Sequence, residues 1–400
     1  MPALQMTHRS LSPALEQVRQ KALRAIAPLK PADSSTTVDP EFLFNARRTD
    51  AGRQLPPYYL VYFLLVDLLE FRNIGQSEKL AWSVPVDYKG QAFVIEHRKL
   101  GLGVFAEDPV RDENSAREIV IRIKKAVKAA QPFFDALADE AVAQSLVNVV
   151  NNSSELLQRY EYLRDHYKSK QAEPDRRREE REVTEGTTSN GNTWRSVSFP
   201  AYRLRVEASW LAMSAVEAFF SWTEHSFIHL AILLGKIKTA EKVAAVAKAD
   251  WSVKFKSALD ITDQSTKIFY DRLIAMRQEL RNYVAHGAFG KQGEAFSFHS
   301  GAGAVPVLLP HRVGTKKFKL GHGLDFDLPA AIDLLEEFRS HLWSDSRAPA
   351  EIYIQQSELP VVLTMAADGT YANAMTSVED MNTFVEHLAA ETDLAANMDW

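Results

Sequence analysis

The sequence predicts a mainly α-helical protein with small β elements (α+β), and three observations lead to this fold class. Apolar residues recur at helical spacing over two long stretches, 202–234 and 267–286. Strand-like segments are short and bounded by turn residues, as between 82 and 105. The 400 residues are 46% hydrophobic and 25% charged, which is ordinary for a globular chain of two or three domains.

Composition narrows the classes of function. The chain has no cysteine, which excludes disulfides, cysteine-bound zinc and thiol nucleophiles. Its net charge of −5 argues against a broadly basic nucleic-acid surface, so any contact with RNA must be local. The apolar run Tyr58–Leu69 is interrupted by Asp67 and is too short to cross a membrane, and Met1–Ser12 has no apolar signal core. We expect a cytoplasmic protein without membrane contact.

The N-terminal region combines helices with a small sheet. Ser12-Pro13 is typical of a helix start, and the apolar spacing predicts a helix to Ile26 that acts as a lid or an arm. The strongly apolar stretch 58–71 predicts a core helix. Residues 82–105 predict a three-stranded antiparallel meander with a turn at Lys89-Gly90.

A domain boundary is predicted after a second helical stretch, 114–182. That stretch ends in a run of mixed charges, which indicates a solvated helix tail. Thr184–Thr193 then has turn residues, including Asn190-Gly191, and no apolar periodicity. We predict an N-terminal α+β domain over 1–183 and a linker over 184–199. The domain would have a sensor or regulatory role and would bind a regulatory protein or ligand.

The second half is predicted to be a helical domain over 200–343. Its first helix, 202–234, is apolar on more than one face and should be buried from two sides. A short helix near 251–259 and a long one over 267–286 follow, and Gly287 is placed to cap the latter. Strands within an insertion at 289–320 precede a closing helix at 330–343. Residues 344–400 predict a hairpin plus a helix from Val378.

Three polar residues stand near the end of the helix over 267–286. Arg281, Asn282 and His286 all lie on the face turned away from that helix's own apolar stripe. The same face carries small apolar residues such as Ala275, which favours packing against a second helix. The economical hypothesis is a two-fold homodimer in which equivalent helices meet and line one cleft.

These groups suit cleavage of RNA without a metal or another cofactor. His286 is a candidate general acid or base, because an imidazole titrates near neutral pH and a helix C-terminus favours its protonated form. Arg281 would hold the phosphate oxygens in its planar fork, and Arg277 would add charge one turn earlier. Asn282 would orient the imidazole or the phosphate. Glu217 is either an exposed carboxylate or one that shapes the electrostatics around His286.

Three segments together resemble the HEPN domain family. They are the apolar helix segment Ala212–Phe220, the group Trp251, Lys254 and Phe255, and the segment Met276–Gly287, which contains arginine, a polar residue, three variable residues and histidine. The resemblance covers about 200–343, and the N-terminal half resembles no family. It implies an all-α bundle that dimerises and often acts as a metal-independent endoribonuclease in toxin, antiviral or RNA-processing systems. Arg281 and His286 would be its catalytic pair and Asn282 the polar neighbour.

The chain departs from the family pattern at two places. Toxins of this family that pair with a nucleotidyltransferase often have tyrosine two residues after the histidine, whereas this chain has Ala288. Silencing by nucleotidylation of that tyrosine is therefore not expected. The inserted strands at 289–320 form a flap that would cover the cleft.

Other interpretations of the sequence stay open. The helical domain is alternatively a non-catalytic scaffold for dimerisation or ligand binding. His225 and His229, one helical turn apart, are weak candidates for a metal site with Glu224 or Glu217. In the N-terminal region, Asp87 and Glu96-His97-Arg98-Lys99 weakly resemble a magnesium-dependent, restriction-like nuclease site, although a charged strand end explains them more simply.

Overall fold

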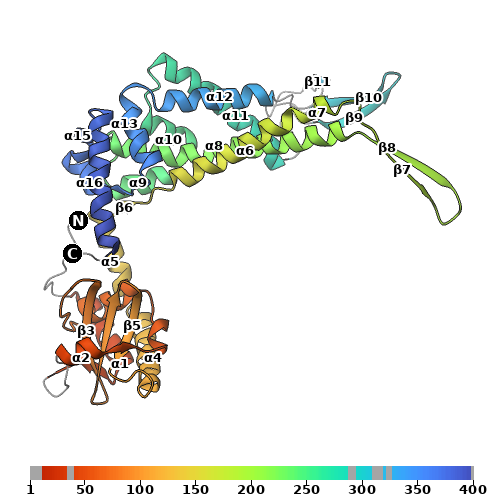
Figure 1. The fold of residues 1–400 in the computed structure, drawn as a ribbon. Coiled ribbons are helices and arrows are strands. Elements are labelled where there is room, and N and C mark those ends of the chain that lie inside the picture. The colour runs from red at the N-terminus through yellow and green to blue at the C-terminus, as the bar shows by residue number, and fades with distance from the viewer. Residues whose placement is uncertain (1–10, 34–39, 287–293, 309–318, 321–326, 398–400) are drawn as a thin grey trace. The chain divides into compact units, whose positions relative to one another are not determined.

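The computed structural model describes residues 11–33, 40–286, 294–308, 319–320 and 327–397 (Figure 1). The protein is mainly helical with small antiparallel sheets, which confirms the predicted fold class. The chain forms two compact units: unit 1 comprises Met1–Val147 and Glu386–Trp400, and unit 2 comprises Asn148–Val385.

Unit 1 contains a five-stranded antiparallel sheet with the strand order β1-β3-β4-β5-β2. Its strands are β1 (Leu29–Pro31), β2 (Arg47–Arg48), β3 (Leu80–Tyr88), β4 (Gln91–Arg98) and β5 (Gly101–Ala106). The β3–β4 turn is formed by Lys89 and Gly90, which both adopt positive φ angles of 57° and 84°. Such a pair matches the twist of a two-residue hairpin. The predicted meander is confirmed.

Helices pack against this sheet to complete the core of unit 1. They are α1 (Pro13–Ile26), α2 (Pro40–Asn45), α3 (Tyr58–Tyr62) with the π-helix Phe63–Leu68, α4 (Glu113–Ala129) and α5 (Gln131–Ala143). Ser12 caps α1 by accepting a hydrogen bond from the Leu15 amide. Ala22 and Ile26 of α1 are buried in the same core cluster as Val84. The lid-or-arm interpretation was therefore wrong, because α1 is a core helix.

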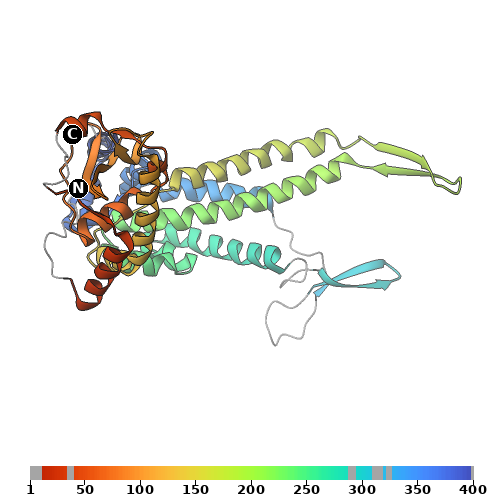
Figure 2. The ribbon, with the colours of Figure 1, turned by 90° about the horizontal axis from the view of Figure 1, so that it is seen from below.

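Unit 2 is a bundle of antiparallel helices. The main ones are α6 (Ser153–Gln171), α8 (Pro200–Leu233), α10 (Trp251–Ala258), α11 (Gln264–His286) and α12 (Leu328–Leu342). Figure 2 shows α6 beside α8 along most of their length. The two helices run antiparallel, because Ser153 contacts Ser226 at 3.0 Å near one end of the pair and Lys170 contacts Glu207 at 2.6 Å near the other.

An aromatic core explains why α8 is apolar on more than one face. The Phe219 ring contacts Tyr160 of α6 on one side and Phe338 of α12 on another, at centroid distances of 5.0 and 6.3 Å. Further along, Phe227 contacts Phe255 of α10 at 5.2 Å. Burial of α8 from several sides, predicted from its sequence, is thus confirmed.

The predicted boundary at 184–199 was wrong. These residues belong to an antiparallel hairpin of β7 (Glu182–Thr187) and β8 (Thr193–Ser198), and the Trp194 ring lies against Gly186. The division between units falls instead between Val147 and Asn148. Helices α6 and α7 (Glu173–Arg176), assigned from sequence to the N-terminal domain, therefore belong to unit 2.

The remaining elements of unit 2 confirm one prediction and correct another. The insertion forms a three-stranded sheet of β9 (Glu294–Ser300), β10 (Gly303–Leu308) and β11 (Lys319–Leu320), as expected. The predicted hairpin after 344 is absent from the described residues 344–375, which fold mainly as short helices. The elements are β6 (Asn148–Val149), α9 (Ala240–Ala247), α13 (Ala348–Glu351), the π-helix Ile352–Gln356, β12 (Val361–Val362), which pairs with β6, α14 (Leu363–Asp368), α15 (Thr370–Ala374) and α16 (Val378–Asn397).

Candidate functional site

The candidate site lies at the C-terminal end of α11. This helix runs unbroken from Gln264 to His286, so Arg281, Asn282 and His286 occupy its last two turns. The side chains of 281–286 and the whole of Gly287 and Ala288 lie outside the described residues. The structure therefore places the backbone of the predicted catalytic residues, while their mutual geometry stays a prediction.

The helical turn before Arg281 is tied to two neighbouring helices through Glu224 of α8. Arg277 of α11 donates a hydrogen bond from Nη2 to Glu224 Oε1 at 2.7 Å. Lys254 of α10 donates from Nζ to Glu224 Oε2 at 2.6 Å. One carboxylate thus joins cations from two other helices, and we call Glu224, Lys254 and Arg277 the ion triad.

The ion triad is largely shielded from water. The side chain of Lys254 is 8% exposed, and those of Glu224 and Arg277 are 27% and 34% exposed. Burial opposes ionisation of Glu224, but hydrogen bonds from Lys254 and Arg277 outweigh it and lower the pKa of the carboxyl. A half-buried carboxylate between two cations is strongly held in its charged form.

Aromatic side chains pack against Arg277 of the ion triad. The Arg277 guanidinium lies 5.4 Å from the centre of the Phe220 ring and 5.9 Å from that of Trp251. Trp251 is buried and donates from Nε1 to Thr223 Oγ1 at 2.9 Å. Planar cations favour such positions over aromatic faces. This stacking fixes the direction of the Arg277 side chain.

This engagement limits the atoms of Arg277 that could contact a substrate. Its Nη2 is used by Glu224, and its Nη1 is buried without a hydrogen-bond partner in the described part of the chain. A nitrogen that water cannot reach is also out of reach of a phosphate. The structure thus shows Arg277 joining α11 to α8, while its contribution of charge to a substrate stays a prediction.

The ion triad was not predicted from the sequence, although each of its members was considered separately. Glu224 appeared only as a possible metal ligand and Lys254 only as part of the family resemblance. Glu217 and Glu224 are seven residues apart and so share one face of α8, but this spacing does not identify Lys254 or Arg277 as partners. The structure leaves Glu217 exposed, two turns from the ion triad along α8.

The outer face of α11 is open in the single chain. Ile268 is 49% exposed, and Asp271, Ala275 and Gln278 are exposed as well. Ile274 is half-buried. The surface predicted to meet a second copy is therefore accessible, while the dimer itself stays a prediction.

The two histidines considered as metal ligands hold backbone groups instead. His225 Nε2 accepts a hydrogen bond from the Asn152 amide at 2.9 Å, and His229 Nε2 lies 3.1 Å from the Val150 carbonyl. Burial, and secondarily His229, lowers the pKa of His225 to about 3. Within the described residues, no group of three or more acidic or histidine side chains is arranged to hold a metal ion. The pair fastens the segment before α6 to α8.

Asp87 and Glu96 of unit 1 are too far apart to share a metal ion. Asp87 pairs with Ala92 across β3 and β4, whereas Ser83, four residues earlier on β3, pairs with Glu96. Four residues along a strand span about 13 Å. Asp87 accepts from the Gly90 amide in the turn, and Glu96 accepts from Ser83 and Arg98. These carboxylates have structural roles, which favours the charged-strand-end interpretation.

Comparison of the chain with protein-family models, curated proteins and solved structures gives no match. Across the helices that the structure describes, none is both long and apolar enough to span a membrane.

Proposed function

We propose that the end of α11 is the active site of a metal-independent endoribonuclease of HEPN type. The observation that carries this proposal is the unbroken course of α11 through Arg281 and Asn282 to His286. A continuous helix keeps a cation, an amide and an imidazole within two turns of one rigid element. Rigid elements hold catalytic groups more accurately than loops do.

The proposed reaction is a transesterification within the RNA strand, in which the phosphoryl group moves from the 5′ oxygen to the 2′ oxygen. A 2′-hydroxyl attacks the adjacent phosphorus while His286 removes its proton, and the bond from phosphorus to the 5′ oxygen breaks. A protonated histidine, supplied by the second copy in a dimer, gives a proton to the leaving 5′ oxygen. The products are a 2′,3′-cyclic phosphate and a 5′-hydroxyl. Arg281 stabilises charge on the non-bridging oxygens, and Asn282 orients the imidazole or the phosphate.

The ion triad supports this proposal by fixing the approach of α11 to the site. Arg277 precedes Arg281 by one helical turn and is held by Glu224 at 2.7 Å. Displacement of reacting groups by even about 1 Å costs about 100-fold in rate. A charged anchor one turn away is therefore well placed to keep Arg281 and His286 in position.

The proposal includes an assembly and a cellular setting. The exposed outer face of α11 is the surface on which a second copy would complete a cleft. Unit 1 would sense the protein or ligand that triggers a toxin or antiviral effector. A cytoplasmic setting fits a chain without cysteine.

A cleavage assay in EDTA tests the function. We expect the wild-type protein to cleave RNA, and His286→Ala and Arg281→Ala to lose about 100-fold to 10,000-fold of the rate. His387→Ala is the matched control, because that histidine is 74% exposed on α16. Cleavage by His286→Ala at the wild-type rate would exclude His286 as the catalytic residue, and absence of cleavage by the wild-type protein would favour the non-catalytic scaffold.

A further inference from the structure

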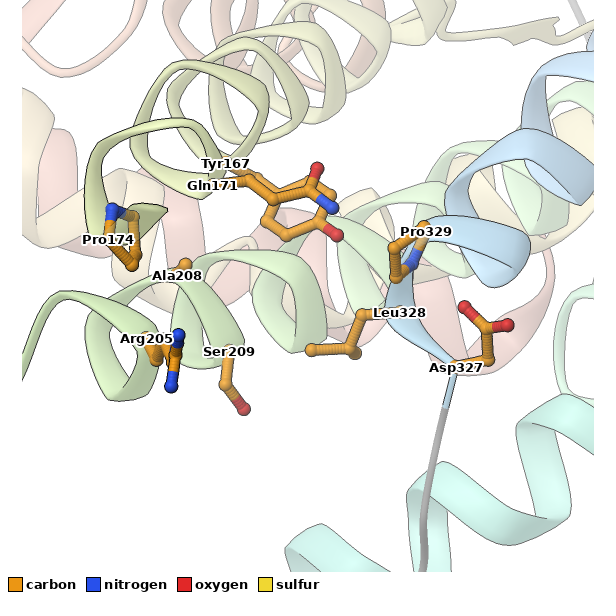
Figure 3. A pocket seen from close by; sticks show the side chains of 9 residues that line it. All are labelled: Tyr167, Gln171, Pro174, Arg205, Ala208, Ser209, Asp327, Leu328 and Pro329. Atoms are coloured by element: carbon orange, nitrogen blue, oxygen red, sulfur yellow. The ribbon is translucent and has the colours of Figure 1, made fainter. Parts of the chain in front are cut away.

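An open pocket of about 480 Å³ lies at one end of the unit 2 bundle, between α6, α7, α8 and the first turn of α12 (Figure 3). Buried Tyr167 lines it together with two charged residues, Arg205 and Asp327. Arg205 pairs with Asp175 at 3.6 Å, and Asp327 caps α12 by accepting from the Ala330 amide. Contacts within the bundle thus account for both charges. They do not account for the sheet that precedes α12 in the chain.

That sheet, with the strand order β11-β10-β9, has one long strand at its edge (Figure 1). β10 is the central strand, and among the described residues no further strand pairs with β9 or β11. β11 has only two residues, whereas β9 has seven. The edge of β9 therefore offers the longer row of backbone N–H and C=O groups outside the ladder. Such an edge is a ready template for pairing with another strand.

One face of this sheet is apolar and largely exposed. Phe296 pairs with Val307 and Phe298 with Val305 across β9 and β10, and Val307 pairs with Leu320 of β11. Paired residues lie on one face of a sheet, and so do residues two apart on one strand, so these five side chains share a face. Phe296, Phe298 and Leu320 are 57%, 46% and 67% exposed. Contiguous exposed apolar surface of this kind marks interaction sites.

Pro306 indicates which backbone groups of β9 face the free edge. It pairs with Ser297 across β10 and β9, and proline has no N–H to donate. The pair therefore fits a non-hydrogen-bonded position of the antiparallel ladder, at which the N–H and C=O of Ser297 point away from β10. By alternation along the strand, those of His299 point the same way. The free edge thus carries donors and acceptors on both sides of its midpoint.

The sequence around Ser297 is complementary to itself. A two-fold axis through this residue places Ser297 opposite its counterpart in an antiparallel partner strand. Phe296 then lies opposite Phe298 of the partner subunit, and Phe298 opposite Phe296 of the partner subunit. Both aromatic pairs fall on the apolar face, and such pairs stabilise sheets. The span 295–299 has no lysine, arginine, aspartate or glutamate, so no like charges oppose each other.

We propose that β9 pairs with β9 of a second copy of this chain, which joins two three-stranded sheets into one six-stranded antiparallel sheet. β9 begins eight residues after His286, so the strand contact follows directly on the helix proposed to line the cleft. One two-fold axis relates both contacts. The inference rests on the proposed function only for this shared axis. The strands are inserted relative to the all-α family pattern, so the contact is particular to this chain.

Cross-linking of the full chain through a single introduced cysteine tests the contact, because the chain has no cysteine of its own. In Ser297→Cys the two thiols lie opposite each other, with Cα atoms about 5.5 Å apart, and a bis-maleimide with a short arm should link them. Ser300→Cys is the matched control on the same strand, since both serines are exposed. Its two copies would lie about 20 Å apart and should give about tenfold less cross-linked dimer.

Two charge variants, made in the Ser297→Cys chain, test the register and remove the same apolar surface. Phe296→Lys/Phe298→Glu sets opposite charges against each other across the contact, whereas Phe296→Glu/Phe298→Glu sets like charges against each other. Opposite charges stabilise a cross-strand pair and like charges destabilise it. We expect the lysine–glutamate variant to form about tenfold more cross-linked dimer than the variant with two glutamates.

Absence of the Ser297→Cys dimer, an equal yield from Ser300→Cys, or equal yields from the two charge variants would overturn the proposal. Protection of the β9 amides from hydrogen exchange by added RNA, in a chain that does not cross-link, would assign the apolar face to RNA and also overturn it. Cross-linking without RNA cleavage would leave the strand contact in place and overturn only the ribonuclease, whereas cleavage without cross-linking would do the reverse.

Discussion

Each compact unit holds a carboxylate paired with arginine, and the two differ in what they connect. Glu96 in unit 1 accepts from Arg98 on its own strand and from Ser83 on the neighbouring strand, at 2.6 and 2.8 Å. Glu224 in unit 2 instead joins α8 to α10 and α11. The first pairing neutralises charge locally, while the second fixes the position of the helix that carries the proposed active site.

The largest expected difference concerns stability after loss of each charge. Glu224→Gln should lower the free energy of unfolding of unit 2 by about 2 to 3 kcal/mol, because it leaves Lys254 and Arg277 shielded without a counter-charge. Glu96→Gln should cost about 1 kcal/mol in unit 1, since Arg98 is 38% exposed and can turn toward water. Hydrogen exchange of peptides from each unit measures both values. Equal losses in the two units would remove the distinction.

Acid should affect the two units in opposite directions. The pKa of Glu224 is lower in the folded state than its ordinary 4.5, so its contribution is present above that pH and is lost as pH falls through the folded value. Burial raises the pKa of Asp67 in unit 1 from 3.8 to about 6. Between pH 3.8 and about 6, Asp67 binds a proton in folded unit 1 but not in the unfolded chain. The stability of unit 1 should therefore increase as pH falls from 7 to 5.

Hydrogen exchange at pH 7, 5 and 4 in wild type, Asp67→Asn and Glu224→Gln separates these two effects. Asp67→Asn should remove the gain in unit 1 between pH 7 and 5, and Glu224→Gln should reduce the loss in unit 2 below pH 4.5. If the gain in stability of unit 1 persists in Asp67→Asn, a titrating group other than Asp67 causes it.

The smallest expected effect comes from exchanging arginine for lysine. Both Arg277 and Arg98 lie over aromatic rings, the latter 4.0 Å from the centre of Phe105. Lysine keeps the charge but loses the planar fork and the stacking. Arg277→Lys should slow RNA cleavage about threefold by loosening α11, whereas Arg98→Lys should leave the rate unchanged. A comparable slowing in both variants would show that the anchor of α11 has no special role.

Elements with strong periodicity could be predicted from the sequence. The apolar stripes of α8 and α11, and the alternation in β3 to β5, predicted helices and strands that the structure confirms. The hairpin of β7 and β8 was mistaken for a linker, because its residues are almost all exposed and offer no apolar alternation. The boundary at Val147 was missed because α6 is polar and because the residues that α6 contacts are distant from it in the sequence.

Part of the candidate site could likewise be predicted from the sequence, and part could not. Arg281, Asn282 and His286 were predicted from their spacing and from a family resemblance. The ion triad was missed because its members are separated by 30 and 53 positions, and periodicity carries no information about such pairs. The pocket near Tyr167 was missed for the same reason, since its lining comes from four separate elements.

The most direct test of the ribonuclease uses an RNA whose cleaved nucleotide carries a single 2′-deoxy substitution, in EDTA. We expect the wild-type protein to cleave the unmodified RNA to a 2′,3′-cyclic phosphate and a 5′-hydroxyl, which mass spectrometry identifies. We also expect no cleavage at the substituted position and none by His286→Ala. Cleavage of the 2′-deoxy position at the unmodified rate would contradict attack by the 2′-hydroxyl and, with it, the proposed ribonuclease of HEPN type.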